Sequence, residues 1–207
     1  MIVRRLGNKK KVAKLIMPHF PPHKVYIEPF FGAGGMFFQK PKAKYNIVND
    51  LDSDVFNLFQ VVMRKKEELI NAFCIMPIHS DLLNYWKKNE EVEPIMKALR
   101  FLLRSNFGYL GKPDTISFAL TNTKEIFLKN IENTFDFIGN VKFNNVDFRK
   151  FLKCWSLRHE KDKDFVFIYN DPPYQNTNDN YSNSFVKQDL IDLIEANIKT
   201  GCKFAIS

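Results

Sequence analysis

The residues with the most distinctive chemistry are Asp171-Pro172-Pro173-Tyr174, which follow the apolar run Asp164–Asn170. The run predicts a central buried strand, and the two prolines remove two backbone donors and stiffen the turn behind it. A carboxylate, a rigid carbonyl oxygen and an aromatic ring are thereby brought together within four residues. This set suits a planar ligand with an exocyclic amine. The amine would donate to Asp171 and to the carbonyl of Pro172, while the ring stacks on Tyr174.

A second candidate site is the glycine-rich turn 29–35, which follows a predicted short strand at 24–28. Gly32 and Gly34 allow a ligand to approach the backbone closely. The pattern lacks the third glycine of a dinucleotide-binding loop and the Gly-Lys-Ser/Thr of a phosphate-binding loop, so both of those are disfavoured. A tight turn that binds no ligand is the alternative interpretation.

Asp50 follows the next predicted strand, Tyr45–Val48. A carboxylate at this position can accept hydrogen bonds from both hydroxyls of a ribose. The competing interpretation is a helix cap. Asp52 or Ser53 could cap the following helix equally well, which would leave Asp50 free.

The elements that must position these residues alternate strand and helix, which is typical of a doubly wound α/β fold. We expect a short basic helix over 8–18, a helix starting at about Met36, and an amphipathic helix behind Ser53. Further strands are expected at 141–146, 164–170 and 203–207, with a helix over 187–198 whose Leu190, Leu193 and Ile194 face inward.

The stretch between residues 65 and 140 has a different, helical pattern, for example over Pro94–Arg104, followed by an irregular loop from Asn106 to Thr123. We therefore predict one α/β domain formed by 1–64 and 141–207. The segment 65–140 would be a helical insertion between the second and third strands.

The composition is that of an ordinary globular protein, with 207 residues, 45% hydrophobic residues and a net charge of +8. No apolar run is long enough for a membrane span. The three cysteines are too few and too far apart for a disulfide framework or a cysteine metal site, so we expect small core residues in a reducing cytosol. The four histidines form no ligand-spaced set, and no metal site is expected. The positive charge favours a polyanionic partner.

Taken in chain order, the motifs resemble those of the Dam-type (D12 class) DNA adenine-N6 methyltransferases over essentially the whole chain. The motifs are Gly7-Asn8-Lys9, Glu28-Pro29-Phe30-Phe31-Gly32-Ala33-Gly34, Asn49-Asp50, Asp147-Phe148 and Asp171-Pro172-Pro173-Tyr174. The resemblance implies a Rossmann-like class I methyltransferase sheet, S-adenosylmethionine as methyl donor and duplex DNA as substrate. It also implies that the helical insertion 65–140 recognises the target.

The resemblance further assigns roles to residues. Asp171, Pro172, Pro173 and Tyr174 would hold the target base. The implied cofactor-binding residues are Arg5, Lys9, Pro29, Phe30, Gly32, Gly34, Asp50, Asp147, Phe148 and Asp171. The stretch Leu103–Tyr109 resembles a degenerate copy of the family's DNA-reading hairpin, with Arg104, Asn106, Tyr109 and Lys112 as candidate DNA contacts. A surface residue at a helix end is the competing interpretation of Arg104.

The implied mechanism requires the adenine to leave the duplex, because its amine is unreachable inside the stack. Asp171 and the Pro172 carbonyl would localise the lone pair of the amine, which then attacks the sulfonium methyl directly. Neither an enzyme nucleophile nor a metal is needed, and the Pro-Cys pair of cytosine-C5 methyltransferases is absent.

Two features depart from the family pattern. Arg5 stands where the family has an aromatic residue, although arginine can stack on a purine. The family sheet has seven strands, whereas this chain stops in the fifth, so C-terminal strands are expected to be missing. An exposed sheet edge would favour low stability or self-association.

Two other functions stay open at this point. An RNA guanine-N2 methyltransferase can share the Pro-Pro motif, but the N-terminal Gly-x-Lys and the long insertion disfavour it. A non-catalytic DNA-binding remnant would fit the missing strands, but the intact motif at Asp171 disfavours it. A cognate restriction endonuclease is a further candidate partner, the expected location is cytoplasmic, and the sequence does not indicate the oligomeric state or the recognition site.

Overall fold

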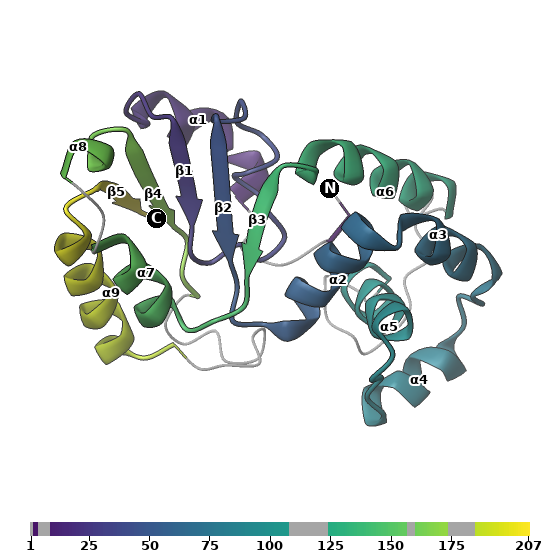
Figure 1. Cartoon of the computed structure of the whole chain (residues 1–207). Helices are drawn as coiled ribbons and strands as arrows, with labels where there is room; N and C mark the ends of the chain where they lie inside the picture. Colours follow the sequence, from purple (N-terminus) through teal and green to yellow (C-terminus); the bar gives the residue numbers. More distant parts are fainter. Residues whose placement is uncertain (1, 4–8, 108–123, 157–159, 174–184) are drawn as a thin grey trace. The chain divides into compact units, whose positions relative to one another are not determined.

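The computed structural model of the chain describes residues 2–3, 9–107, 124–156, 160–173 and 185–207 (Figure 1). Contacts within the chain define two compact units. The sheet unit comprises Lys9–Asp52 and Asn140–Ser207, and the helical unit comprises Ser53–Gly139 with Ile2 and Val3. The contacts thus group the helix behind Ser53 with the helical unit, whereas the sequence pattern placed the division near residue 65.

The sheet unit is built on five parallel strands in the order β3-β2-β1-β4-β5. The strands are β1 (Val25–Glu28), β2 (Tyr45–Asn49), β3 (Val141–Asn144), β4 (Val166–Asn170) and β5 (Lys203–Ile206). The strand order reverses at β1, because β2 and β3 lie on one side of it and β4 and β5 on the other. Doubly wound sheets bind ligands at such a switch point, outside the carboxyl ends of the strands.

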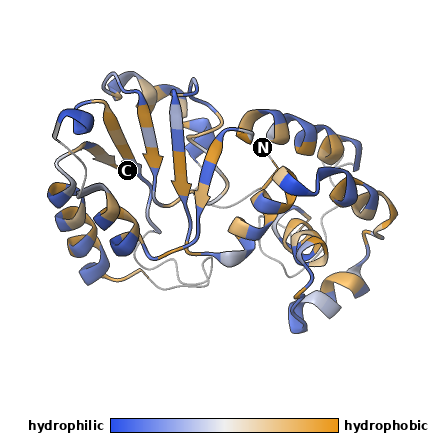
Figure 2. Cartoon of the chain, viewed as in Figure 1, coloured by the Kyte–Doolittle hydropathy of each residue, from blue (hydrophilic) through white to orange (hydrophobic). Residues whose placement is uncertain are grey.

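Apolar sequence explains the buried position of β4 between β1 and β5. All five of its residues are buried, and Figure 2 shows the apolar runs along the strands. A strand in a parallel sheet is covered on both faces, so it carries a continuous apolar run rather than an alternating one. Ile27 of β1 pairs with Ile47 of β2 and Ile168 of β4, which aligns the carboxyl ends of these three strands.

Helices α7 (Phe148–Ser156) and α9 (Lys187–Thr200) pack together with the sheet. The α7 side chains at spacings of three and four residues, Phe148, Phe151, Leu152 and Trp155, are all buried. Burying each such side chain contributes about 1.5–3 kcal/mol, so this stripe holds α7 in place. The unit also contains the short elements η1 (Lys9–Lys11), α1 (Ala13–Ile16), η2 (Met17–His19) and α8 (Glu160–Lys163).

The described part of the helical unit consists of α2 (Ser53–Arg64), α3 (Lys66–Ile75), α4 (Ser80–Lys88), α5 (Pro94–Asn106) and α6 (Lys124–Ile138). Arg100 of α5 is buried and connects α5 with α4 and α2. Its Nε donates to the carbonyls of Trp86 and Asn89, and its Nη1 lies 3.5 Å from an oxygen of Asp54. No helix of the described residues is both long and apolar enough to cross a bilayer.

The prediction of a helix starting at about Met36 is wrong. The chain forms consecutive turns there, with Phe38 N–H donating to Gly34 O and Gln39 N–H to Met36 O. Gly34 adopts φ +70°, outside the helical region, and Pro41 follows closely. The segment between them is too short to propagate a helix.

Two expectations about burial are also wrong. Ile194 of α9 is 39% exposed, whereas Leu193 is fully buried. Consecutive residues of a helix point in different directions, and in α9 the side of Leu193 faces the sheet. Of the three cysteines only Cys202 is buried, while Cys74 and Cys154 are exposed. All three are free thiols.

Candidate functional site

The candidate site lies at the carboxyl ends of β1, β2, β3 and β4. Asp171 directly follows β4, and its Oδ1 lies 3.1 Å from Nζ of Lys9. Both side chains are largely buried, with 21% and 10% of their surfaces exposed. The lysine that the family resemblance assigned to the cofactor therefore neutralises the aspartate of the Pro-Pro motif.

The Asp171 carboxylate is held in a partly desolvated position. Burial raises the pKa of Asp171 above its ordinary value, and the ammonium of Lys9 and a hydrogen bond from Ser207 oppose this rise. Ser207 Oγ lies 2.8 Å from the hydroxyl of Tyr169 and 3.5 Å from Asp171 Oδ1. A carboxylate in low dielectric interacts more strongly with a hydrogen-bond donor than it would in water.

The turn after Asp171 offers a second acceptor. Pro172 is buried and Pro173 is partly buried. Among the residues that the structure describes, none donates a hydrogen bond to the Pro172 carbonyl. The pairing of the Asp171 carboxylate with this carbonyl toward one ligand stays a prediction, and Tyr174 lies outside the described residues.

The glycine turn after β1 uses its two glycines differently. Gly32 and Gly34 both have positive φ, at +52° and +70°. A Cβ on Gly34 would lie 2.6 Å from the ring of Phe38 and 2.8 Å from that of Phe31, so this glycine is required for close packing. A Cβ on Gly32 would meet nothing within 4 Å, so the chain borders open space there. That space is available to a ligand.

Asp50 orders this turn rather than standing free as expected. Its Oδ2 accepts a hydrogen bond from Gly32 N–H at 2.6 Å, and its Oδ1 accepts one from Asp52 N–H at 2.8 Å. Both carboxylate oxygens of Asp50 therefore hold backbone N–H groups of the loops that follow β1 and β2.

Asn49 joins three strand ends and was not predicted as a site residue. Its side-chain amide donates to Pro29 O at 3.0 Å and to Val146 O at 2.9 Å, and its oxygen accepts from Val146 N–H at 3.1 Å. Asn145 also donates to the carbonyl of Asp50 at 2.7 Å. Asn49 is part of the Asn49-Asp50 motif of the family resemblance, but nothing in the sequence indicates its contacts with Pro29 and Val146.

Three phenylalanine rings gather at the same edge. The ring centroids of Phe30 and Phe148 are 5.3 Å apart, and that of Phe185 lies 5.9 Å from Phe30 and 6.3 Å from Phe148. Phe185 precedes α9 and was missed, because its position follows only from the packing of α9 against α7. The cluster provides an apolar surface of the kind that receives a flat ring.

Arg149 packs against this cluster. Its guanidinium lies 4.4 Å from the centroid of the Phe148 ring and pairs with carboxylates of Asp147, Asp189 and Asp192. Burial opposes the charge of Asp189, but hydrogen bonds from Arg149 and the Val186 backbone lower its pKa, and hydrogen bonds from Gln188 and Arg149 lower the pKa of Asp192. The predicted residue Asp147 also accepts a hydrogen bond from Arg149 N–H at 2.8 Å, so it caps α7.

Glu28, the last residue of β1, is a buried carboxyl that sequence reasoning left without a role. It accepts a hydrogen bond from the Tyr26 hydroxyl at 2.9 Å. Burial raises the pKa of Glu28 well above its ordinary value, although Tyr26 and Lys40 oppose the rise. Burial also lowers the pKa of Lys40 to about 8. The ammonium of Lys40 lies over the Tyr26 ring, 4.0 Å from its centroid.

The candidate DNA contacts are placed only in part. Arg104 is partly buried in the last turn of α5. Asn106 is buried, and its amide donates to Ile2 O at 2.9 Å and Leu102 O at 3.1 Å, so the expected direct DNA contact by Asn106 is not supported. Tyr109, Lys112 and the cofactor candidate Arg5 lie outside the described residues. No metal-binding group of His, Cys, Asp and Glu occurs among the residues described.

Comparison with known proteins places this site in a family. A model of the D12 class N6 adenine-specific DNA methyltransferases matches residues 6–203. The chain is 30% identical to the DNA adenine methylase of Salmonella typhi and 29% identical to that of Escherichia coli, each over 111 residues. These residues cover 51% of this chain and 40% of each relative.

A longer alignment links the chain to a Type II methyltransferase. It is 26% identical over 190 residues to the Type II methyltransferase M1.LlaDCHI of Lactococcus lactis subsp. cremoris, covering 81% of this chain and 63% of that protein. The chain thus spans less than two thirds of the length of these curated relatives. Because the family model matches nearly its whole length, the chain belongs to the D12 class N6 adenine-specific DNA methyltransferases.

Proposed function

We propose that this protein transfers a methyl group from S-adenosylmethionine to the N6 amine of adenine in duplex DNA. The observation that carries the proposal is the largely buried Asp171 carboxylate directly after β4, ahead of the rigid Pro172-Pro173 turn. An adenine amine has two hydrogens, and the Asp171 carboxylate and the Pro172 carbonyl could accept both of them. Family membership supports the same reaction.

Asp171 and Pro172 would act on the lone pair of the amine. In free adenine this lone pair is delocalised into the ring and reacts poorly. Two acceptors oriented by the rigid turn would favour a geometry in which the lone pair points away from the ring. The new N–C bond forms as the methyl–sulfur bond breaks, and the amine then loses one proton toward Asp171 or solvent. Tyr174 is proposed to stack on the extruded base, which offsets part of the unstacking cost.

The described residues fit S-adenosylmethionine, which supplies an electrophilic sulfonium methyl group when bound. The open space at Gly32 can admit the ligand beside the backbone, and Asp50, which holds the Gly32 N–H, is proposed to bind the ribose hydroxyls. Phe30, Phe148 and Phe185 provide an apolar surface for the adenine ring. We propose roles in the same site for Lys9, Pro29, Gly34 and Asp147, and for Arg5.

Duplex DNA is the proposed partner, and the net charge of +8 supports attraction to its phosphates. We propose that the insertion 65–140, which lies almost wholly within the helical unit, recognises the target sequence. Arg104, Tyr109 and Lys112 remain the candidate contacts. The Type II relative raises a cognate restriction endonuclease as a further candidate partner, and a cytoplasmic location would suit a DNA-modifying enzyme.

We also propose that further strands extend the sheet beyond β5. β5 is a terminal strand among those described, and its Phe204 is 37% exposed. Ile191 and Ile198 of α9 are exposed as well. An open apolar edge of this kind favours pairing with another chain. The 207-residue chain should therefore self-associate in sedimentation velocity, and a monomer at all concentrations would contradict this proposal.

The function is tested by incubating the chain with duplex DNA and methyl-labelled S-adenosylmethionine. Nucleosides from the digested product are then separated. The expected result is label in N6-methyl-2′-deoxyadenosine. The amount of label should fall steeply with added salt, because salt weakens DNA binding. Label in guanine-N2 of a ribosomal RNA fragment, with none in DNA, would instead establish the RNA activity.

A further inference from the structure

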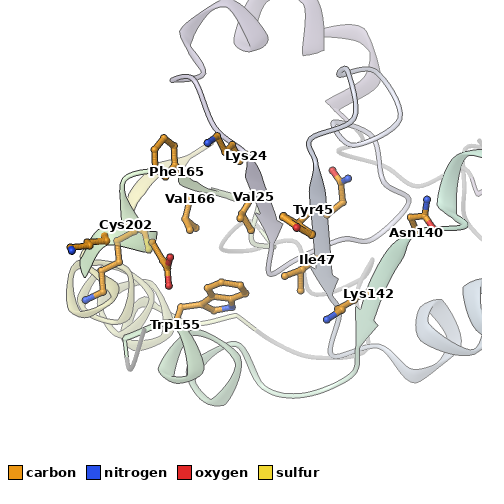
Figure 3. A pocket seen from close by; sticks show the side chains of 14 residues that line it. Lys24, Val25, Tyr45, Ile47, Asn140, Lys142, Trp155, Phe165, Val166 and Cys202 are labelled. Carbon is orange, nitrogen blue, oxygen red and sulfur yellow. The ribbon is translucent and has the colours of Figure 1, made fainter. Parts of the chain in front are cut away.

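A cavity of about 560 Å³ lies at the amino ends of the strands, at the opposite edge of the sheet from Asp171. Its volume is within the range of about 300–1,000 Å³ typical of small-molecule sites. Figure 3 shows Trp155 of α7 across from Lys24 and Phe165, with Tyr45 and Lys142 on a further side. None of the proposed cofactor or base-binding residues lines it.

The lining is aromatic and aliphatic. Trp155, Tyr45 and Phe165 contribute rings, and the remaining wall includes apolar side chains from β1, β2 and β4. Tyr45 and Phe165 are 54% and 47% exposed, so their rings are accessible to solvent. Such a surface favours a flat apolar ligand.

The rim is positively charged. The lining contains four lysines, Lys24, Lys142 and two from α8, against the single carboxylate of Asp162. Lys24 Nζ lies 4.1 Å from the centroid of the Phe165 ring. Within the part of the chain that the structure describes, neither Lys24 nor Lys142 forms an ion pair with a carboxylate. Both ammonium groups can therefore receive an anion.

We propose that this cavity binds a small aromatic anion, with one or two fused rings against Trp155 and Tyr45 and a carboxylate, sulfonate or phosphate group at Lys24 or at Lys142, which lie on different sides of the cavity. Lysine and anion would form charge-assisted hydrogen bonds, which are about twice as strong as neutral ones. Because the cavity and Asp171 are at opposite edges of the sheet, such a ligand does not compete with S-adenosylmethionine. The inference does not depend on the proposed methyl transfer.

Isothermal titration of the full chain with 2-naphthoate tests the proposal, with quenching of tryptophan fluorescence as a second readout. At least one of the variants Lys24→Met and Lys142→Met should weaken binding about fivefold or more. Lys150→Met, an exposed lysine of α7 that does not line the cavity, should bind like the native chain. The neutral analogue 2-naphthalenemethanol should bind about tenfold more weakly than naphthoate.

Three results would overturn the proposal. They are no binding of naphthoate, equal binding of the neutral analogue, and unchanged affinity in both lysine variants. Displacement of naphthoate by S-adenosylhomocysteine would also overturn it, because the probe would then occupy the carboxyl edge. Circular dichroism of each variant verifies the fold without requiring enzyme activity, so failure of the methyl-transfer proposal leaves this test intact.

Discussion

Lys9 and Asp171 come from opposite ends of the chain, and their side chains meet at 3.1 Å at the carboxyl edge of the sheet. The lysine lies in η1 and the aspartate follows β4. Burial disfavours a charge on Asp171, whereas the ammonium of Lys9 favours it. Lys9 therefore helps to keep Asp171 in the ionised form that can accept a hydrogen bond from an amine.

The first prediction concerns this pair. Lys9→Met removes the charge and the hydrogen bond of Lys9, which lower the pKa of Asp171, and leaves only Ser207 to oppose the effect of burial, so this pKa should rise further. Since the ionised carboxylate is the active form, the acidic limb of the pH profile of kcat/KM should shift to higher pH. Lys10→Met, at an exposed neighbouring position, should leave the limb in place. An unshifted limb in Lys9→Met would show that the pair does not control Asp171.

The two turn glycines should respond differently to alanine. Gly34→Ala combines positive φ with contact to the Phe38 and Phe31 rings, and should lower the free energy of unfolding by about 2–4 kcal/mol. Gly32→Ala should lower the free energy of unfolding only through backbone strain, by about 1–2 kcal/mol. It should instead weaken cofactor binding, because the new methyl group occupies the open space beside the backbone.

Urea unfolding and calorimetric titration with S-adenosylhomocysteine separate these effects. The interpretation of the turn would be wrong if Gly34→Ala were as stable as Gly32→Ala. Unchanged ligand affinity in Gly32→Ala would show that the open space is not part of the cofactor site.

Phe185→Ala should raise the KM for S-adenosylmethionine about three- to tenfold with little change in kcat. The reason is that aromatic contacts contribute about 0.5–1.5 kcal/mol, and those of Phe185 belong to the proposed adenine surface. Phe204→Ala, at an exposed position on β5, serves as the matched control. Equal KM values in the two variants would remove Phe185 from the site.

Glu28→Gln should stabilise the fold in a pH-dependent way. Burial raises the pKa of Glu28 in the folded state, so its contribution to stability is fully present below the ordinary value of 4.5 and is lost as pH rises through the raised pKa. Glutamine stays neutral and can still accept from Tyr26. Its melting temperature should match the native one near pH 4 and exceed it at pH 8, by about 2–4 °C per kcal/mol.

The exposed Glu90→Gln should show no such pH-dependent difference. A Glu28→Gln variant that is less stable than the native chain at pH 8 would show that the carboxylate is ionised and favourably paired in the fold.

Much of the sheet could be predicted from local pattern. The apolar runs ending at Glu28, Asn49 and Asn170 predicted strands, and parallel strands bring their carboxyl ends to one edge. The approach of the glycine turn, Asp50 and Asp171 to that edge follows from these strands alone. The rule needs no knowledge of how side chains pack.

The remaining features depend on contacts between distant segments. Neither the ion pair of Lys9 nor the bridging amide of Asn49 has a local pattern in the sequence. Asn106 was predicted as a DNA contact. It is instead buried in the helical unit, where its amide donates to the backbone carbonyl of Ile2. Periodicity placed Ile194 inward, and only the rotation of α9 against the sheet shows it exposed.

The central claim is that Asp171 holds the reacting amine. The most direct test is the single-turnover rate of methyl transfer to duplex DNA at saturating S-adenosylmethionine. Asp171→Ala should lower this rate about a hundredfold or more. Asp164 is exposed and lies just before the amino end of β4, so Asp164→Ala should keep the native rate. Equal rates in the Asp171→Ala variant and the native chain would contradict the account.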